Sequence, residues 1–275
     1  MAIIAMDDKV LYDIAKAIRA KTGLKTEYTQ EELSMFGIED VYHSAYKEGE
    51  GGGYSWGKTE GIEQGKQAQY DLFWDKFQKN GTRTDYQYAF ANWVSSEGIF
   101  KPKYDIKPVG GAQRMFHGFQ TSVSLPDVCE ECGIVMDFSK VTSFEYFMYN
   151  YCAISRIGIV DCSSVTNLNR AFLMASSLKT IDKLIVHEGI TSYTDCFAGA
   201  IKLQNITIEG TIAGTGFSVS SHSELTHDSL MSIIYALKDY SGTTTTKTIT
   251  LGATNLAKLT DAEKAIATQK GWTIA

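Results

Sequence analysis

Five apolar positions recur in the same order three times between residues 141 and 206, and this repeat restricts the fold more than any other feature. The middle copy has Val165, Leu168, Phe172, Leu178 and Ile181. The residues 24 positions earlier are Val141, Phe144, Met148, Ile154 and Ile157, and those 25 positions later are Ile190, Tyr193, Phe197, Leu203 and Ile206. An amphipathic helix repeats its apolar face about every 3.6 residues and a half-buried strand about every 2, and neither produces this spacing. The pattern therefore predicts a solenoid, in which every copy forms one coil and each apolar position stacks on its counterpart in the next coil.

Each copy also contains a short apolar run that predicts a strand. "ISRIGI" at 154–159 and "LQNITI" at 203–208 are such runs, and they should stack into a parallel sheet. The larger residues Met148, Phe172 and Phe197 should fill the interior opposite that sheet. A fainter fourth copy comes first in the chain, before an insertion around "PDVCEECG", and has Val109, Ala112, Phe116, Ser122 and Leu125. A period of about 20 to 29 residues with one strand is typical of leucine-rich repeats.

Two of these copies, "VTNLNRAFLMASSLKTI" and "ITSYTDCFAGAIKLQNITI", resemble the BspA-like leucine-rich repeats of bacterial surface antigens. "FSKVTSFEYFMYNYCAI" is also similar to the related surface-protein repeats with the pattern D-x-S-x-V-T-x-M-x-x-M-F. The resemblance covers roughly residues 108–212. It implies an α+β chain whose centre is a short β-solenoid of BspA-like repeats, and it implies that these repeats bind something outside the cell.

The N-terminal flank divides into two helical segments. Residues 1–40 contain the amphipathic stretch "DDKVLYDIAKAIRAKTG" and a second short helix that starts at "TQEEL". This helix-loop-helix resembles the start of bacteriophage tail and baseplate proteins, which implies an attachment module. Residues 41–81 have a glycine at every fourth position, at Gly49, Gly53, Gly57, Gly61 and Gly65. A glycine costs about 1 kcal/mol in a helix interior, so we expect compensation by close helix packing in a homotrimer or dimer; the alternative is a flexible linker.

The remaining flanks should close the two ends of the solenoid. Residues 82–107 form an aromatic-rich connector that we expect to seal the first coil, because repeat arrays need caps. Residues 213–275 predict an α/β cap. It has a helix with Thr226 as N-cap, a strand at "TKTITLG", a helix with a Thr260–Glu263 capping box that ends at Gly271, and a strand at "WTIA". "LGATNLAKLTDAEKAIATQKGW" resembles the end of repeat proteins encoded by phages of gut bacteria.

Composition excludes several classes of function. The net charge of −6 disfavours nucleic acid as a partner, because phosphate binding needs clustered lysine and arginine. No apolar run approaches the length of a membrane span, and the N-terminus lacks the features of a signal peptide. The five cysteines include one "CEEC" pair, Cys129 and Cys132, without the second ligand pair that a structural zinc site needs. We therefore expect no metal, no cofactor and no membrane insertion.

The sequence contains no catalytic motif, so we expect a binding protein rather than an enzyme. The residues just after the large apolar position differ between coils and are most aromatic in the first two. The candidate ligand-binding residues are His117, Phe119, Tyr149, Asn150 and Tyr151. If they share one edge of the solenoid, they suit stacking on sugar rings or on a protein partner. The alternative is that Phe119 and Tyr151 only pack the insertion near Cys129.

The combined resemblance of both flanks and the repeats identifies the chain as similar to phage tail-tip or receptor-binding-type proteins. This implies a virion protein, made in the host cytoplasm, that contacts other tail or baseplate proteins and a glycan or protein of the host surface. Two alternatives remain. One is a bacterial surface or secreted adhesin with the same repeats, and the other is a glycan-degrading tail enzyme whose acid pair meets only in three dimensions.

Overall fold

The computed structural model describes residue 86, residues 89–91, residue 93 and residues 100–275. The chain divides into two compact units, Met1–Gly81 and Thr82–Ala275, and the fold below is that of the second unit. The expected attachment module (1–40) and the glycine-rich helix (41–81) lie outside the described residues. The five glycines from Gly49 to Gly65 therefore stay a prediction.

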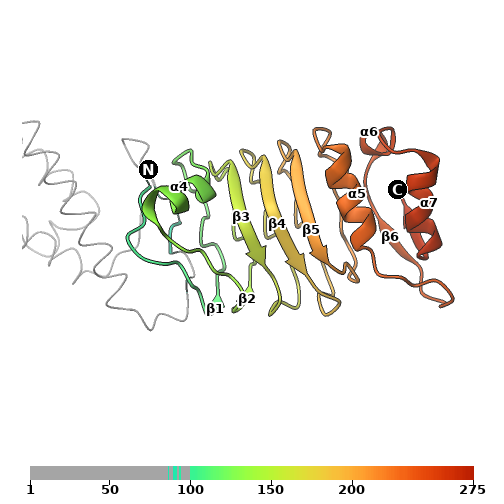
Figure 1. The fold of residues 1–275 in the computed structure, drawn as a ribbon, viewed down its shortest axis with the longest axis horizontal. Helices are drawn as coiled ribbons and strands as arrows, with labels where there is room; N and C mark the ends of the chain where they lie inside the picture. Colours follow the sequence, from blue (N-terminus) through green and yellow to red (C-terminus); the bar gives the residue numbers. More distant parts are fainter. Residues whose placement is uncertain (1–85, 87–88, 92, 94–99) are drawn as a thin grey trace, which may run out of the picture. The chain divides into compact units, whose positions relative to one another are not determined.

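The described elements are mainly short strands followed by a helical C-terminal part (Figure 1). In chain order they are β1 (Gly110–Gly111), α4 (Leu125–Cys132), β2 (Val141–Ser143), β3 (Arg156–Asp161), β4 (Thr180–Val186), β5 (Asn205–Gly210), α5 (His227–Ala236), β6 (Lys247–Ile249), α6 (Ala253–Leu256), α7 (Asp261–Gln269) and β7 (Trp272–Ile274). We call each copy of the repeat a coil. Coils one to four comprise residues 109–140, 141–164, 165–189 and 190–213.

The strands β3, β4 and β5 form a parallel sheet in which apolar residues pair with apolar residues (Figure 1). Ile157 pairs with Ile181 and Ile181 with Ile206, which are offsets of 24 and 25 residues. All three side chains are buried. The register therefore has the same period as the apolar positions of the sequence. β3 and β5 each begin two residues later than "ISRIGI" and "LQNITI".

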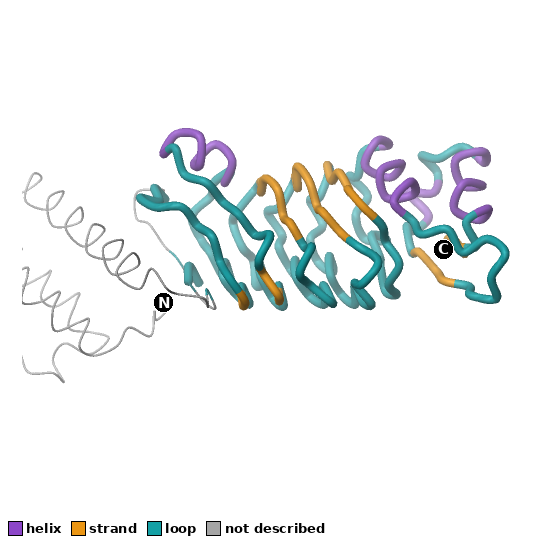
Figure 2. The backbone as a smooth tube through the Cα atoms, turned by 60° about the horizontal axis from the view of Figure 1, so that its bottom comes forward, coloured by secondary structure: helices purple, strands orange, loops and turns teal. Residues whose placement is uncertain are grey.

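The side of the coils opposite this sheet consists of loops and turns (Figure 2). Backbone hydrogen bonds join one coil to the next there as well. The Phe172 N–H donates to the Cys196 carbonyl at 2.8 Å, and the Met174 N–H donates to the Ala198 carbonyl at 2.7 Å. These bonds use backbone groups that would otherwise lack partners in a loop against the core. Both sides of the coil are thereby held in place.

Aromatic rings fill the interior between the sheet and the loops. Phe172 lies over Phe197 with ring centroids 5.4 Å apart and planes only 2° from parallel. In coil two, the ring that reaches Phe172 is that of Phe147, at 6.3 Å. Met148, which was expected to fill the interior at this level, is also buried. Phe90 continues the packing from the connector, stacking on Phe116 at 5.5 Å.

The first copy of the repeat departs from the expectation at two positions. Val109 is 42% exposed and Ser122 is also exposed, so the prediction that these two residues lie in the interior is wrong. The strand register explains the first error, because Gly110, not Val109, pairs with Val141. The insertion contains α4, which packs against β3. A longer coil with an added helix has freedom to shift its register, and the regular period fails there.

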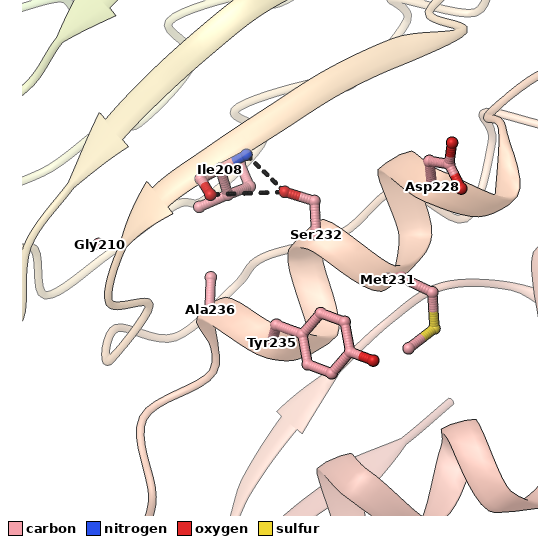
Figure 3. A pocket seen from close by; sticks show the side chains of 7 residues that line it. All are labelled: Ile208, Gly210, Asp228, Met231, Ser232, Tyr235 and Ala236. Carbon is pink, nitrogen blue, oxygen red and sulfur yellow. Dashed lines mark hydrogen bonds between the residues drawn. The ribbon is translucent and has the colours of Figure 1, made fainter.

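Helix α5 covers the open edge of β5 and ends the sheet (Figure 1). Ser229 Oγ accepts a hydrogen bond from the Ile206 N–H at 2.9 Å, and Ser232 Oγ accepts one from the Ile208 N–H at 2.7 Å (Figure 3). The two serines are three positions apart and so share one helix face. They supply the acceptors that a further strand would provide, which protects an edge that could otherwise pair with another chain.

The C-terminal cap contains the expected helix ends. The Thr226 side chain accepts a hydrogen bond from the Ser229 N–H at the start of α5. Thr260 and Glu263 form a complete capping box at the start of α7. Both capping predictions are confirmed. β6 and β7 pair in parallel, and such a pair needs a crossover connection, which the segment containing α6 and α7 provides.

Candidate functional site

The structure separates the five predicted ligand-binding residues into two groups. Phe119 is fully buried and packs on Phe100 at 5.1 Å, so its prediction as a ligand contact is wrong. The other four lie on the turns opposite the sheet. His117, Tyr149 and Asn150 are half-buried, whereas Tyr151 is 64% exposed. The His117 and Tyr149 rings are 5.2 Å apart, so coils one and two present one aromatic cluster.

The structure adds a tyrosine between two arginines that the sequence analysis did not select. The Arg114 guanidinium lies 5.0 Å from the centre of the Tyr146 ring, and the Arg170 guanidinium lies 5.7 Å from it. Arg170 also donates a hydrogen bond to the Tyr146 hydroxyl at 3.0 Å. Its Nε lies 3.5 Å from a carboxylate oxygen of Asp195. Tyr146 in turn packs edge-on against Tyr149 at 5.1 Å.

These contacts connect four consecutive coils along one surface. We call this surface the tyrosine–arginine ridge. Its members Arg114, His117, Tyr146, Tyr149 and Arg170 are joined by these contacts, and we include Asn150 and Tyr151, which follow Tyr149 in the same turn. The same backbone turn places its main members. Arg114, Tyr146, Arg170 and Asp195 all have positive φ, between 54° and 59°. Each stands two residues before the large buried position of its coil, and that spacing is the sequence signal by which they could have been found.

Tyr151 departs from the repeat. In the other coils the corresponding residues Phe119, Ala175 and Ala200 are buried. The N–H of Ala175 donates to the Phe172 carbonyl of its own coil. The Tyr151 N–H instead donates to the Met174 carbonyl of the next coil at 2.9 Å, with φ at 56°. The turn is therefore one residue longer in coil two. The chain returns to the core at Cys152, which is buried, whereas in the other coils the preceding position is already buried.

Electrostatics adds a positive character to the ridge. Partial burial, and secondarily the charge of Arg114, lower the pKa of His117, which favours its neutral form at neutral pH. Hydrogen bonding to Tyr146 and the nearby Asp195 carboxylate raise the pKa of Arg170. The ridge therefore offers aromatic rings, a neutral imidazole, an amide and guanidinium groups. Such a set can stack on a ligand and donate hydrogen bonds to it.

A second feature is a shallow hollow of about 530 Å³ where α5 meets the end of β5 (Figure 3). Its lining residues are Ile208, Gly210, Asp228, Met231, Ser232, Tyr235 and Ala236. Ser232 is occupied by its hydrogen bonds to Ile208. Asp228 is the one carboxylate among the lining residues. Paired-acid hydrolysis of a glycoside needs two carboxyl groups about 5 to 10 Å apart, and this hollow does not supply them.

The other groups of interest among the described residues are the cysteines and the potential metal ligands. The five cysteines are free thiols, and burial raises the pKa of Cys129 to about 11, which keeps it protonated and weakly nucleophilic. In residues 100–275 and the few described before them, no three His, Cys, Asp or Glu side chains gather as metal ligands do. None of the helices in that same part is long and apolar enough to span a membrane.

Comparisons of the chain with protein families, with characterised proteins and with solved structures found no match. The residues of the ridge and the repeat that positions them are therefore the features of this chain that bear on its function.

Proposed function

We propose that this chain is a non-enzymatic structural protein of a phage virion, part of a tail fibre, tail tip or baseplate, and that it binds the host cell surface. In this proposal residues 108–212 are a BspA-like leucine-rich-repeat solenoid. The tyrosine–arginine ridge is the observation that carries the binding function. It gathers side chains from coils one to three, and Tyr and Arg are the residue types most enriched at the energetic centres of interfaces.

The ridge stands on a scaffold suited to binding. Tyr146 and Tyr149 belong to a turn whose neighbours Phe147 and Met148 are fully buried, so the turn is anchored in the core. Its carbonyls accept hydrogen bonds from coil one, with Tyr149 O accepting from the Gly118 N–H at 2.8 Å. An anchored surface loses little conformational entropy when a ligand binds, and this favours affinity.

The N-terminal segments have the complementary roles in this proposal. Residues 1–40 would attach the protein to other tail or baseplate proteins, and the glycine repeat of residues 41–81 would join three or two copies. Several ridges on one particle would then bind the host surface together. Multivalent binding can exceed the affinity of a single site by about 100-fold or more, so a weak individual site suffices.

The experiment has two parts. Antibodies against the protein are applied to purified particles of the phage that encodes it, and the labelled full-length protein is incubated with host cells. We expect antibody labelling of the tail, and cell binding that drops for Arg170→Ala while release of reducing ends from host glycans stays at background. Labelling of uninfected bacterial surfaces instead of particles favours the adhesin alternative. New reducing ends that appear with the protein favour the enzyme.

A further inference from the structure

We propose that the tyrosine–arginine ridge binds a pyranose ring of a surface glycan, and that Tyr151 provides the aromatic face on which this sugar stacks. This inference depends on the binding function proposed above and specifies its ligand class. It starts from Tyr151, whose exposure distinguishes coil two from the other coils.

Tyr151 is exposed at a position where the other three coils bury the corresponding residue. An aromatic side chain gains stability when it is buried, and Phe119 at the corresponding position of coil one is fully buried. Tyr151 is 64% exposed and has a left-handed backbone, with φ at 56°. That conformation is unfavourable for any residue with a Cβ atom. Phe119, Ala175 and Ala200, the corresponding residues of the other coils, do not have positive φ, so this conformation is particular to coil two. Backbone strain of this kind concentrates at functional sites.

The neighbours of Tyr151 match the two kinds of surface on a sugar. A pyranose ring has an apolar face of C–H bonds and a rim of hydroxyl groups. An exposed tyrosine ring covers the face, since stacking brings apolar surfaces together. Asn150 next to it carries an amide that both donates and accepts hydrogen bonds. Tyr149, two residues earlier in the same turn, packs against His117 of coil one with ring centroids 5.2 Å apart.

The small apolar content of the ridge favours a glycan over a protein partner. A stable protein interface buries about 800 Å² on each side and has an apolar centre. Among the residues that the structure describes, the exposed large hydrophobic side chains are Val109, Val135, Tyr151, Ile159, Ile201 and Tyr235. Tyr151 is the one of them that belongs to the ridge. A single exposed ring beside hydrogen-bonding groups is enough for one sugar but supplies little of a protein interface.

The test uses the full-length protein and three variants. Tyr151→Gly removes the ring and relieves the backbone, because glycine adopts positive φ without a steric penalty. Tyr151→Phe keeps the ring. Tyr235→Ala is the matched control, since Tyr235 is also an exposed tyrosine, at 63%, but lies on α5 away from the ridge. Binding is measured on an array of pyranose oligosaccharides and on host envelopes, either untreated, oxidised with periodate to open sugar rings, or digested with protease.

We expect wild-type protein to bind array glycans and envelopes, with binding lost after periodate and kept after protease. Tyr151→Gly should weaken binding about tenfold or more, which corresponds to the loss of one aromatic stacking contact, while its melting temperature stays the same or rises. Tyr151→Phe and Tyr235→Ala should bind like wild type. Binding that survives periodate but not protease, a Tyr151→Gly variant that binds normally, or no glycan bound by wild type overturns the inference. Envelope binding that resists periodate refutes a sugar ligand but is compatible with the proposed host-binding function. Absence of the protein from virions refutes the proposed virion function and does not bear on the sugar ligand.

Discussion

The serine pair of α5 provides a sharp test of how the sheet ends. Ser229 is 4% exposed, and its Oγ is the acceptor for the buried N–H of Ile206 at 2.9 Å. Ser229→Ala leaves this N–H without a partner, and a buried unsatisfied donor costs about 1 to 3 kcal/mol. The Gln204 carbonyl, which accepts from Ser229, is less affected because it also accepts from the Thr226 N–H. Alanine is the better helix former by about 0.5 kcal/mol, so we expect a net loss of about 0.5 to 2.5 kcal/mol.

Ser232→Ala is the matched control for this prediction. The substitution is the same and lies on the same helix face, and Ser232 likewise accepts from β5, through Ile208. Ser232 is only half-buried and borders the open hollow of Figure 3, so water can replace its hydroxyl. We expect a loss of about 0.5 kcal/mol or less. Urea unfolding and hydrogen exchange of the Ile206 amide measure both variants. Equal effects of the two substitutions would refute the idea that buried serines replace a strand.

Three further predictions test other parts of the structure. Gly210→Ala should destabilise the protein by about 2 to 5 kcal/mol, because φ is +98° and the new methyl would meet a backbone oxygen at 1.9 Å. The control Gly133→Ala, with φ +65° and open space around it, should cost about 1 to 2 kcal/mol in the same thermal unfolding assay. Burial lowers the pKa of His222 below its usual 6.5, so on acidification the unfolded chain takes up a proton before the folded chain does, and the stability falls as the pH drops below 6.5. His222→Gln should flatten that part of a stability–pH curve. Removal of the capping box by Thr260→Ala should cost about 1 kcal/mol in urea unfolding, and no measurable change there would contradict the role of this cap.

The regular coils were the most predictable part of the chain. Apolar ladders such as Ile157, Ile181 and Ile206 are visible in sequence because identical surroundings select similar residues at a constant spacing. The capping box at Thr260 was equally visible, because it depends on contacts only three residues apart. Irregular coils were less predictable. Coil one contains the inserted helix α4, and there Gly110 takes the place expected for Val109, a shift that no local pattern marks.

The candidate site was predicted only in part, for a related reason. Tyr149 and Tyr151 were selected as aromatic residues close after a large apolar position. The same criterion selected Phe119, which is buried in the core. Composition cannot distinguish the two outcomes, since they depend on whether the turn continues by one residue. Tyr146 was missed because the equivalent residues of the other coils are Arg114, Arg170 and Asp195. These four residues share a backbone conformation but differ in chemical type, so no residue pattern marks the position in the sequence.

The central claim is that equivalent residues of successive coils stack directly on one another, and the pair Phe172 and Phe197 tests it most directly. Their ring centroids are 5.4 Å apart and their planes differ by 2°. A double-mutant cycle with Phe172→Leu, Phe197→Leu and the double variant measures the interaction between them in urea unfolding. Stacked rings should give a coupling energy of about 0.5 to 1.5 kcal/mol. Additive effects of the two substitutions, within about 0.3 kcal/mol, would contradict the stacked arrangement.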